Sequence, residues 1–140
     1  MRVLKVSTAL DRSSLLFQPW YGLATVSYMA GITFLSSMPR SPRLQPPVLQ
    51  YALNLGHIPL FAGLTYLLVR TIAPRRRPFL TIRACALTAV ALTAFAALDE
   101  CHQAFVPGRS ASPTDLLLDM MGIGAVLLFH RLSALVLEEP

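Results

Sequence analysis

Charged residues and cysteines are both scarce in this sequence. Only 14% of its 140 residues are Asp, Glu, Lys or Arg, whereas a soluble domain usually carries about 25%. The two cysteines, Cys85 and Cys101, lie about 24 Å apart along one predicted helix at about 1.5 Å per residue, too far to pair within it. There is no Cys-x-x-Cys and no His-Glu-x-x-His motif, so nothing predicts a disulfide framework, a haem attachment site or a zinc protease.

Apolar residues are abundant instead and fall into four long blocks. They make up 54% of the chain, the mean hydropathy is +0.56, and the blocks cover about 20–37, 55–73, 80–98 and 114–137. A membrane-spanning helix needs about 20 mostly apolar residues. We therefore predict an all-α integral membrane bundle of four transmembrane helices, one domain over 19–137. A soluble helical bundle would need a charged outer stripe, which these blocks lack.

The N-terminal segment, residues 1–18, does not resemble a cleavable signal peptide. Its apolar stretch is short, is interrupted by Lys5, and is followed at once by Asp11 and Arg12. The segment is either a basic helix on the membrane surface or a frayed tail. Trp20 and Tyr21 then stand where an aromatic anchor at the membrane interface is expected.

The basic residues predict how the four spans are oriented. Nine of the twelve Lys and Arg lie on one side: Arg2, Lys5, Arg12, Arg70, Arg75, Arg76, Arg77, Arg83 and Arg131. The positive-inside rule places this side, with both termini, in the cytoplasm. The connections 38–54 and 99–113 then face outward. Because topology explains the arginine run, we expect no nucleic-acid partner.

Polar side chains gather near the predicted outer surface. Spacings of three and four residues put Asp99, His102 and Gln103 on one helix face, with Glu100 at its flank. Side chains that open the second and fourth spans should reach the same depth. The candidate site residues are His57, Asp99, Glu100, His102, Gln103, Arg109, Asp115 and Asp119. Ionisable groups at this depth are costly unless they are paired, hydrated or used.

Two structural interpretations compete with a functional role for these residues. His102 can be a neutral histidine that is hydrogen-bonded to Asp99 one turn earlier. Glu100 and Arg109 can form an ion pair that closes the loop. In either case the polar side chains would hold helix ends together and bind nothing.

The loop before the fourth span has its own local pattern. Gly108 follows a proline and predicts a turn that lets Arg109 point back over the helix ends. Ser112 has the features of an N-cap, with Pro113 at the first helical position and Asp115 as the acid of a capping box. This is the structural interpretation of Asp115.

The motif Asp-Glu-x-His-Gln-x-Phe-Val-Pro-Gly-Arg over 99–109, followed by Asp115 and Gly122, resembles the signature of the VanZ-like family of small bacterial membrane proteins. His57 and Phe61 match the family's outer histidine and the aromatic residue one turn later. The resemblance covers roughly residues 20–130. It implies four spans in the bacterial inner membrane, a site on the outer side, and an association with low-level resistance to the glycopeptide teicoplanin. It implies no particular reaction.

The sequence departs from the family pattern at two places. The family usually has asparagine where this chain has Asp119. Relatives often carry a charged residue just before the histidine, whereas His57 follows Asn54-Leu-Gly.

Three classes of function fit these observations. The cluster can bind a lipid headgroup, a cell-wall precursor or a glycopeptide, with Arg109 as a planar fork for phosphate or carboxylate. The chain can instead be an accessory or assembly subunit of a larger membrane protein complex, with the cluster locking its helices. An acid–base or metal enzyme is the third class. Because no ligand pair or nucleophile–base pair has a diagnostic spacing, we predict no catalytic residue, metal or cofactor.

Overall fold

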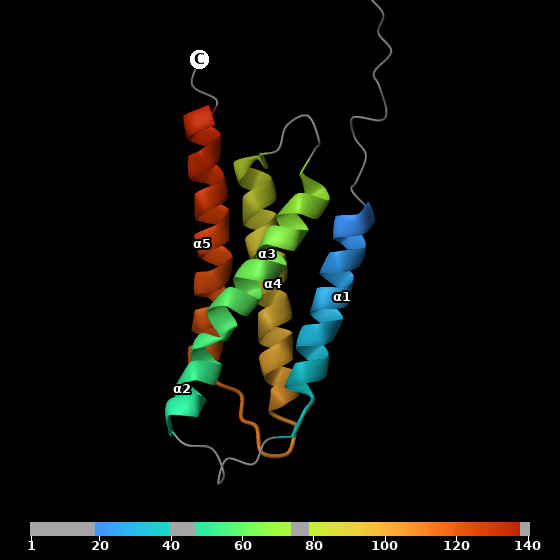
Figure 1. The fold of residues 1–140 in the computed structure, drawn as a ribbon, viewed down its shortest axis with the longest axis vertical. Helices are drawn as coiled ribbons and strands as arrows, with labels where there is room; N and C mark the ends of the chain where they lie inside the picture. Colours follow the sequence, from blue (N-terminus) through green and yellow to red (C-terminus); the bar gives the residue numbers. More distant parts are fainter. Residues whose placement is uncertain (1–18, 40–46, 74–78, 138–140) are drawn as a thin grey trace, which may run out of the picture.

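The computed structural model describes residues 19–39, 47–73 and 79–137, and these ranges contain helices, turns and no strands. The helices are α1 (Pro19–Ser36), α2 (Pro47–Leu55), α3 (His57–Ile72), α4 (Ile82–Gln103) and α5 (Pro113–Leu137). Only Gly56 separates α2 from α3, so these two form one bent rod and the bundle has four rods (Figure 1). The predicted all-α bundle is confirmed.

Three of the rods are long and apolar enough to cross a membrane. They are Tyr51–Ile72, Ile82–Gln103 and Pro113–Leu137, so the chain is a multi-pass membrane protein. The predicted first span, 20–37, coincides with the 18-residue α1, and its passage through the membrane stays a prediction. Helix α1 begins at the end of the bundle where α5 finishes (Figure 1), as an even number of spans requires.

The boundaries differ from the predicted ones in two places. Helix α4 continues to Gln103, past the predicted end at 98, and so carries the polar motif on regular helix. The connection 38–54 is shorter than predicted, because α2 occupies its second half. The N-terminal segment 1–18 and the basic loop around Arg76 lie outside the described residues.

The break between α2 and α3 follows from a proline. Pro59 has no N–H to donate to the carbonyl of Leu55, so the regular ladder of α2 cannot continue through this turn. Gly56 still donates to the carbonyl oxygens of Ala52 and Leu53, at 3.1 and 3.2 Å. The new helix begins with His57. The bend therefore places an imidazole at a helix start, close to the end of the bundle.

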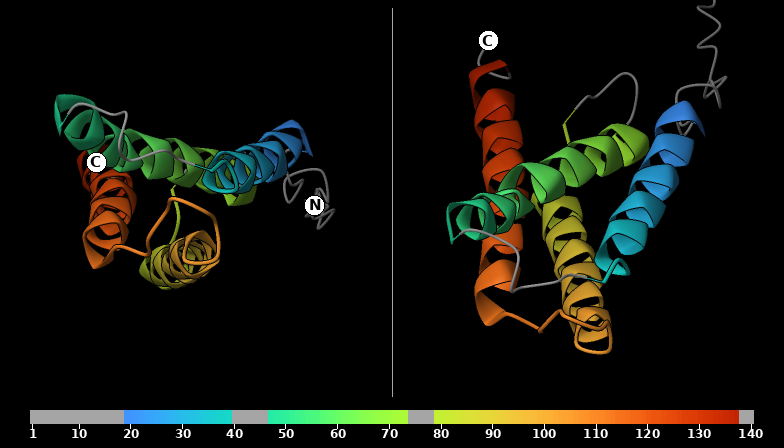
Figure 2. Two further views of the ribbon diagram at one scale, coloured as in Figure 1. Left: turned by 90° about the horizontal axis from the view of Figure 1, so that it is seen from below. Right: turned by 60° about the horizontal axis from the view of Figure 1, so that its bottom comes forward.

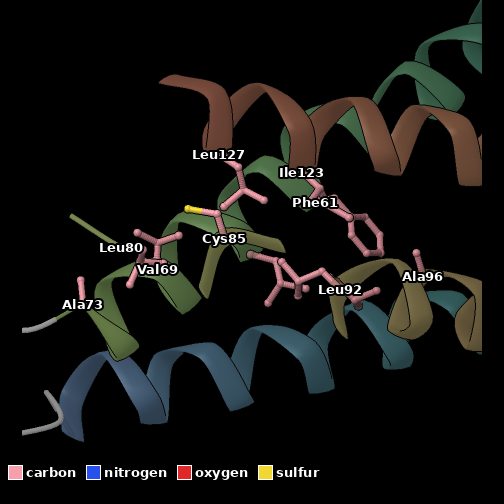
Figure 3. Packing of buried hydrophobic residues seen from close by; sticks show 11 residues of the cluster. Phe61, Val69, Ala73, Leu80, Cys85, Leu92, Ala96, Ile123 and Leu127 are labelled. Carbon is pink, nitrogen blue, oxygen red and sulfur yellow. The ribbon is translucent and has the colours of Figure 1, made fainter. Parts of the chain in front are cut away.

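Helix α3 runs between α1 on one side and α5 on the other (Figure 2). It approaches α5 at Gly122, where an added Cβ would overlap the carbonyl oxygen of Ile58 and lie 3.0 Å from the amide nitrogen of Ala62. Small residues allow such close contact between membrane helices. The core around this crossing contains Phe61, Leu92 and other apolar side chains of all four rods (Figure 3).

The other end of α5 is tied to the start of α4. His130 Nε2 accepts a hydrogen bond from the N–H of Leu80 at 2.9 Å. Arg131 donates to the carbonyl oxygen of the same residue at 3.0 Å. These contacts satisfy backbone groups where α4 has not yet begun its own ladder. They explain His130 and Arg131 as structural residues.

Candidate functional site

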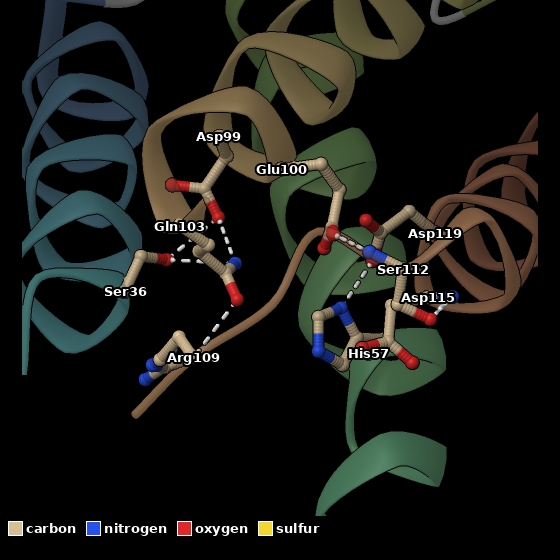
Figure 4. A network of polar contacts seen from close by, with 9 residues as sticks. All are labelled: Ser36, His57, Asp99, Glu100, Gln103, Arg109, Ser112, Asp115 and Asp119. Carbon is tan, nitrogen blue, oxygen red and sulfur yellow. Dashed lines mark hydrogen bonds and ion pairs between the residues drawn. The ribbon is translucent and has the colours of Figure 1, made fainter. Parts of the chain in front are cut away.

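Polar side chains from four helices and one loop meet where α1 and α4 finish and α5 begins (Figure 4). We call this region the polar end. It comprises two groups. The Asp99 group contains Ser36, Asp99, Gln103 and Arg109, and the His57 group contains His57, Glu100, Ser112, Asp115 and Asp119. The predicted convergence of the second, third and fourth spans is therefore present in the structure.

The Asp99 group is a continuous hydrogen-bonded chain between α1 and α4. Asp99 Oδ2 accepts from the hydroxyl of Ser36 at 2.6 Å and from the amide of Gln103 at 2.9 Å. Gln103 in turn accepts from Arg109 Nη1 at 3.0 Å through its own carbonyl oxygen. Two donors thus bind the buried carboxylate of Asp99, and the third, Arg109, binds its partner Gln103. These bonds offset part of the cost of burying the carboxylate.

Arg109 also closes the end of α1. Its Nη2 and Nε donate to the carbonyl oxygens of Leu35 and Met38 at 2.6 and 3.3 Å. The last carbonyls of a helix lack the regular partner four residues on. Arg109 adds a donor to that of Leu35, which also accepts from the N–H of Met38 at 3.3 Å. Gly108 has a φ of 78°, a conformation that glycine adopts readily. The predicted turn that brings Arg109 back over the helix ends is confirmed.

The His57 group contains an ion pair between two helices. His57 Nδ1 on α3 lies 2.9 Å from Asp119 Oδ1 on α5, and Asp119 is only 1% exposed. Glu100 on α4 is 6% exposed, and its Oε2 accepts from the N–H of Ser112 at 2.8 Å. Its other oxygen, Oε1, is buried and has no hydrogen-bond partner.

The predicted capping box at the start of α5 is only half formed. Ser112 does cap the helix, since its hydroxyl accepts from the N–H of Asp115 at 3.2 Å. The reciprocal bond from the N–H of Ser112 goes to Glu100 on α4 and not to Asp115. Asp115 keeps a buried oxygen, Oδ1, without a partner. The predicted bond from the N–H of Ser112 to the carboxylate of Asp115 was therefore wrong, because the carboxylate of Glu100 on α4 accepts from this N–H instead.

Two expected contacts were also wrong. His102 is exposed and lies 3.0 Å from the hydroxyl of Ser37, and it does not bond to Asp99. A helix turns about 100° per residue, so the third and fourth positions after Asp99 lie on opposite flanks of the face that they share with it. The fourth, Gln103, makes the contact. Glu100 accepts from the N–H of Ser112 in place of Arg109, and the hydrogen bonds of Arg109 to described residues go to Gln103, Leu35 and Met38.

A pocket of about 420 Å³ opens beside the Asp99 group. Its polar lining comes from Ser36, His57, Asp99, Gln103 and Arg109. Its apolar lining includes Ile32, Leu35, Leu60 and Phe61 on α1 and α3. The volume is in the range of small-molecule sites.

The sequence model of the VanZ/LLP1 family matches residues 5–134, nearly the whole chain. This chain belongs to the VanZ/LLP1 family. The resemblance drawn from the 99–109 motif, His57 and Phe61 is therefore confirmed. No curated protein and no solved structure matches the chain.

Within this VanZ/LLP1 chain, three side chains also have the composition of a metal-binding set. One ligand atom each from His57, Glu100 and Asp119 lies within 4.8 Å of the other two. They come from α3, α4 and α5, so no short spacing in the sequence could have revealed them. The prediction of no metal ligands rested on the absence of such a spacing.

Ser36 is the polar-end residue that the sequence reasoning missed. A serine at the end of an apolar helix is common and carries no signal by itself. The only sequence signal is that Ser36 and Asp99 both lie at the predicted outer ends of their spans. In the structure its hydroxyl makes the shortest hydrogen bond to that carboxylate, at 2.6 Å.

Proposed function

We propose that the polar end binds the anionic headgroup of a lipid or of a lipid-linked cell-envelope precursor, on the outer side of the bacterial inner membrane. The observation that carries this proposal is the pocket of about 420 Å³, which joins an apolar wall to a polar floor. An amphiphile has the same division. Its chain can lie along α1 and α3 while its headgroup meets the polar floor.

Arg109 supplies the charge complementarity. It is the arginine of the pocket lining, and guanidinium binds phosphate and carboxylate through a planar fork. Its hydrogen bonds to Gln103 and to the end of α1 hold the side chain in place before any ligand arrives. A positioned group loses less entropy on binding than a mobile one. The neighbouring Asp99 has its Oδ2 covered by Ser36 and Gln103.

The outer location is supported by the distribution of basic residues. Nine of twelve Lys and Arg belong to the opposite side of the predicted four-span arrangement, which the positive-inside rule assigns to the cytoplasm. Lipid-linked envelope precursors, anionic lipid headgroups and glycopeptide antibiotics are all encountered on the outer side. The chemistry that the pocket selects is an anionic group attached to an apolar body.

The test compares binding of anionic amphiphiles by matched arginine variants. The full chain in mild detergent is titrated with a short-chain phosphatidylglycerol and with a short polyprenyl diphosphate, and a glycopeptide forms a third arm. Hydrogen bonds to a charged group contribute about 1.5–3 kcal/mol. Since about 1.4 kcal/mol is tenfold in affinity, Arg109→Gln is expected to weaken binding by about 10- to 100-fold.

Arg131→Gln is the matched control. Arg131 also donates to a backbone carbonyl, but at the far end of α5, so this variant should bind as the wild type does. Thermal unfolding of both variants reports any structural loss. Equal binding by wild type, Arg109→Gln and Arg131→Gln would contradict the proposal. The compound that binds most tightly among the phosphatidylglycerol, the polyprenyl diphosphate and the glycopeptide identifies the class of ligand.

A second candidate function is that of an accessory subunit in a larger membrane complex. It is favoured by one observation: hydrogen bonds run from Ser36 on α1 through Asp99 and Gln103 on α4 to Arg109. Such a network can lock the helix ends together without binding a ligand. Purification from native membranes, followed by mass spectrometry, separates the two functions. A stoichiometric protein partner supports the subunit, and a lone chain with bound anionic lipid supports the binding site.

A further inference from the structure

We propose that His57, Glu100 and Asp119 bind one divalent first-row metal ion, with Zn²⁺ the best fit to the donors. The inference goes beyond the proposed headgroup binding and does not rest on it. It concerns the His57 group, whereas the pocket has the Asp99 group as most of its polar lining.

The geometry brings one donor from each of three helices to one point. The three ligand atoms lie within 4.8 Å of one another, and His57 Nδ1 and Asp119 Oδ1 are 2.9 Å apart. Zinc bonds to imidazole nitrogen and carboxylate oxygen are about 2.0–2.2 Å long, so donors on one ion lie about 3–3.5 Å apart. Small side-chain rotations therefore suffice to take up an ion, and no helix has to move.

A buried oxygen without a partner points to a missing ligand. Only 6% of Glu100 is exposed, and its Oε1 has no hydrogen-bond partner. The side chain extends from α4 toward Asp119 and His57 (Figure 4). Leaving a carboxylate oxygen buried and unpaired is costly. A cation among the three side chains would remove this cost.

The charges of the three ligand side chains, His57, Glu100 and Asp119, match a divalent ion. Two carboxylates carry two negative charges and a neutral imidazole carries none. Within the described part of the chain, the one ion pair to either carboxylate is that of Asp119 with His57. A divalent cation balances both carboxylates at once, which a single imidazolium does not.

The donor types select among metals. One nitrogen and two or more oxygens, without sulfur, suit Zn²⁺ and Mn²⁺ better than copper(I) or an iron–sulfur cluster. The nearby cysteines do not compete. Cys101 is exposed on α4, and Cys85 is buried near the opposite end of that helix. The N–H of Ser112, which already holds Glu100 Oε2, orients the carboxylate as an outer hydrogen bond does in known metal sites.

The experiment measures metal binding to the full chain in detergent. The protein is stripped with a chelator and titrated with Co²⁺ as an optical probe, and Zn²⁺ then displaces it in the presence of excess Mg²⁺. We expect one ion per chain, d–d bands without a thiolate charge-transfer band, and a rise in the unfolding temperature on adding Zn²⁺. Glu100→Gln and Asp119→Asn should each weaken binding at least tenfold.

His102→Gln and Cys101→Ser are the controls, since both side chains are exposed at the same end of α4. They should bind metal as the wild type does. Because a core variant can fail to fold, Cu²⁺ electron paramagnetic resonance of the wild type gives a second readout. Hyperfine structure from a single nitrogen is expected. The proposal is overturned by sub-stoichiometric binding, by several coordinated nitrogens, by loss of binding in either control, or by folded Glu100→Gln with unchanged affinity.

Discussion

At the scale of single residues, the polar end shows how buried acids are held at a helix end. Asp99 is buried, and its Oδ2 has one partner on its own helix and one on α1. Ser36 provides the second and thereby links two rods that otherwise touch little. The value of this serine lies in its position opposite Asp99, since its neighbour Ser37 makes similar bonds on an exposed surface.

Replacing Ser36 by alanine should therefore destabilise the bundle. The variant leaves Asp99 with one fewer donor, and hydrogen bonds between membrane helices contribute about 0.6 kcal/mol on average and about 1.7 at most. We expect a loss of about 0.6–1.7 kcal/mol in the free energy of unfolding, measured by denaturant titration in micelles. Ser37→Ala, on the exposed side, should change it by less than about 0.5 kcal/mol. Equal effects of the two substitutions would show that the bond to Asp99 does not stabilise the fold.

At the scale of the helices, the crossing of α3 and α5 positions the His57 group. His57 opens α3, and Asp119 lies one turn before Gly122 on α5. The ion pair between them forms because Gly122 lets the backbones come together at Ile58 and Ala62. Gly124, two residues further on, faces open space. One of the two glycines is thus required for packing and the other is not.

Adding a methyl group at each glycine tests this difference. In Gly122→Ala the new Cβ meets backbone atoms, which cannot rotate away, so the helices must separate. Overpacking of this kind costs about 1–3 kcal/mol, and we expect a matching loss of stability in thermal unfolding. Gly124→Ala has no atom within 4 Å of its Cβ and should be neutral or slightly stabilising. Unchanged stability of Gly122→Ala would contradict the close crossing.

At the scale of the whole molecule, orientation decides which compartment the polar end faces. The end of α1, the end of α4 and the start of α5 lie together (Figure 1), so the 99–113 connection marks the side of the pocket. The predicted topology puts the excess of basic residues on the other side. The side of the membrane on which the 99–113 connection lies is therefore also the side of the pocket.

Cysteine labelling answers it in intact cells. In a Cys101→Ser background, Ser110→Cys places a thiol at an exposed position of the 99–113 connection. We expect a membrane-impermeant maleimide to label it before cell lysis. Arg76→Cys, between α3 and α4 in the sequence, should react only after lysis. The reverse pattern would place the polar end in the cytoplasm and remove the proposed ligands from reach.

Hydropathy and helical spacing alone determined the class of this protein, its long apolar helices and the depth of most polar-end residues. These features follow from local composition, because a hydrocarbon environment admits few structures other than helices of spanning length. The motif over 99–109 likewise identifies the family from the sequence alone.

Partner choice was decided only by the tertiary structure. Helical spacing allows Asp99 to bond to His102 or to Gln103. In the structure the bond goes to Gln103, whose amide also donates to Ser36 on α1. The N–H of Ser112 can donate to the carboxylate of Asp115 or to that of Glu100. Because α4 packs close to this helix start, the N–H donates to Glu100. The grouping of His57, Glu100 and Asp119 likewise needs three helices to meet. A spacing rule describes one helix, whereas these contacts depend on how separate helices pack.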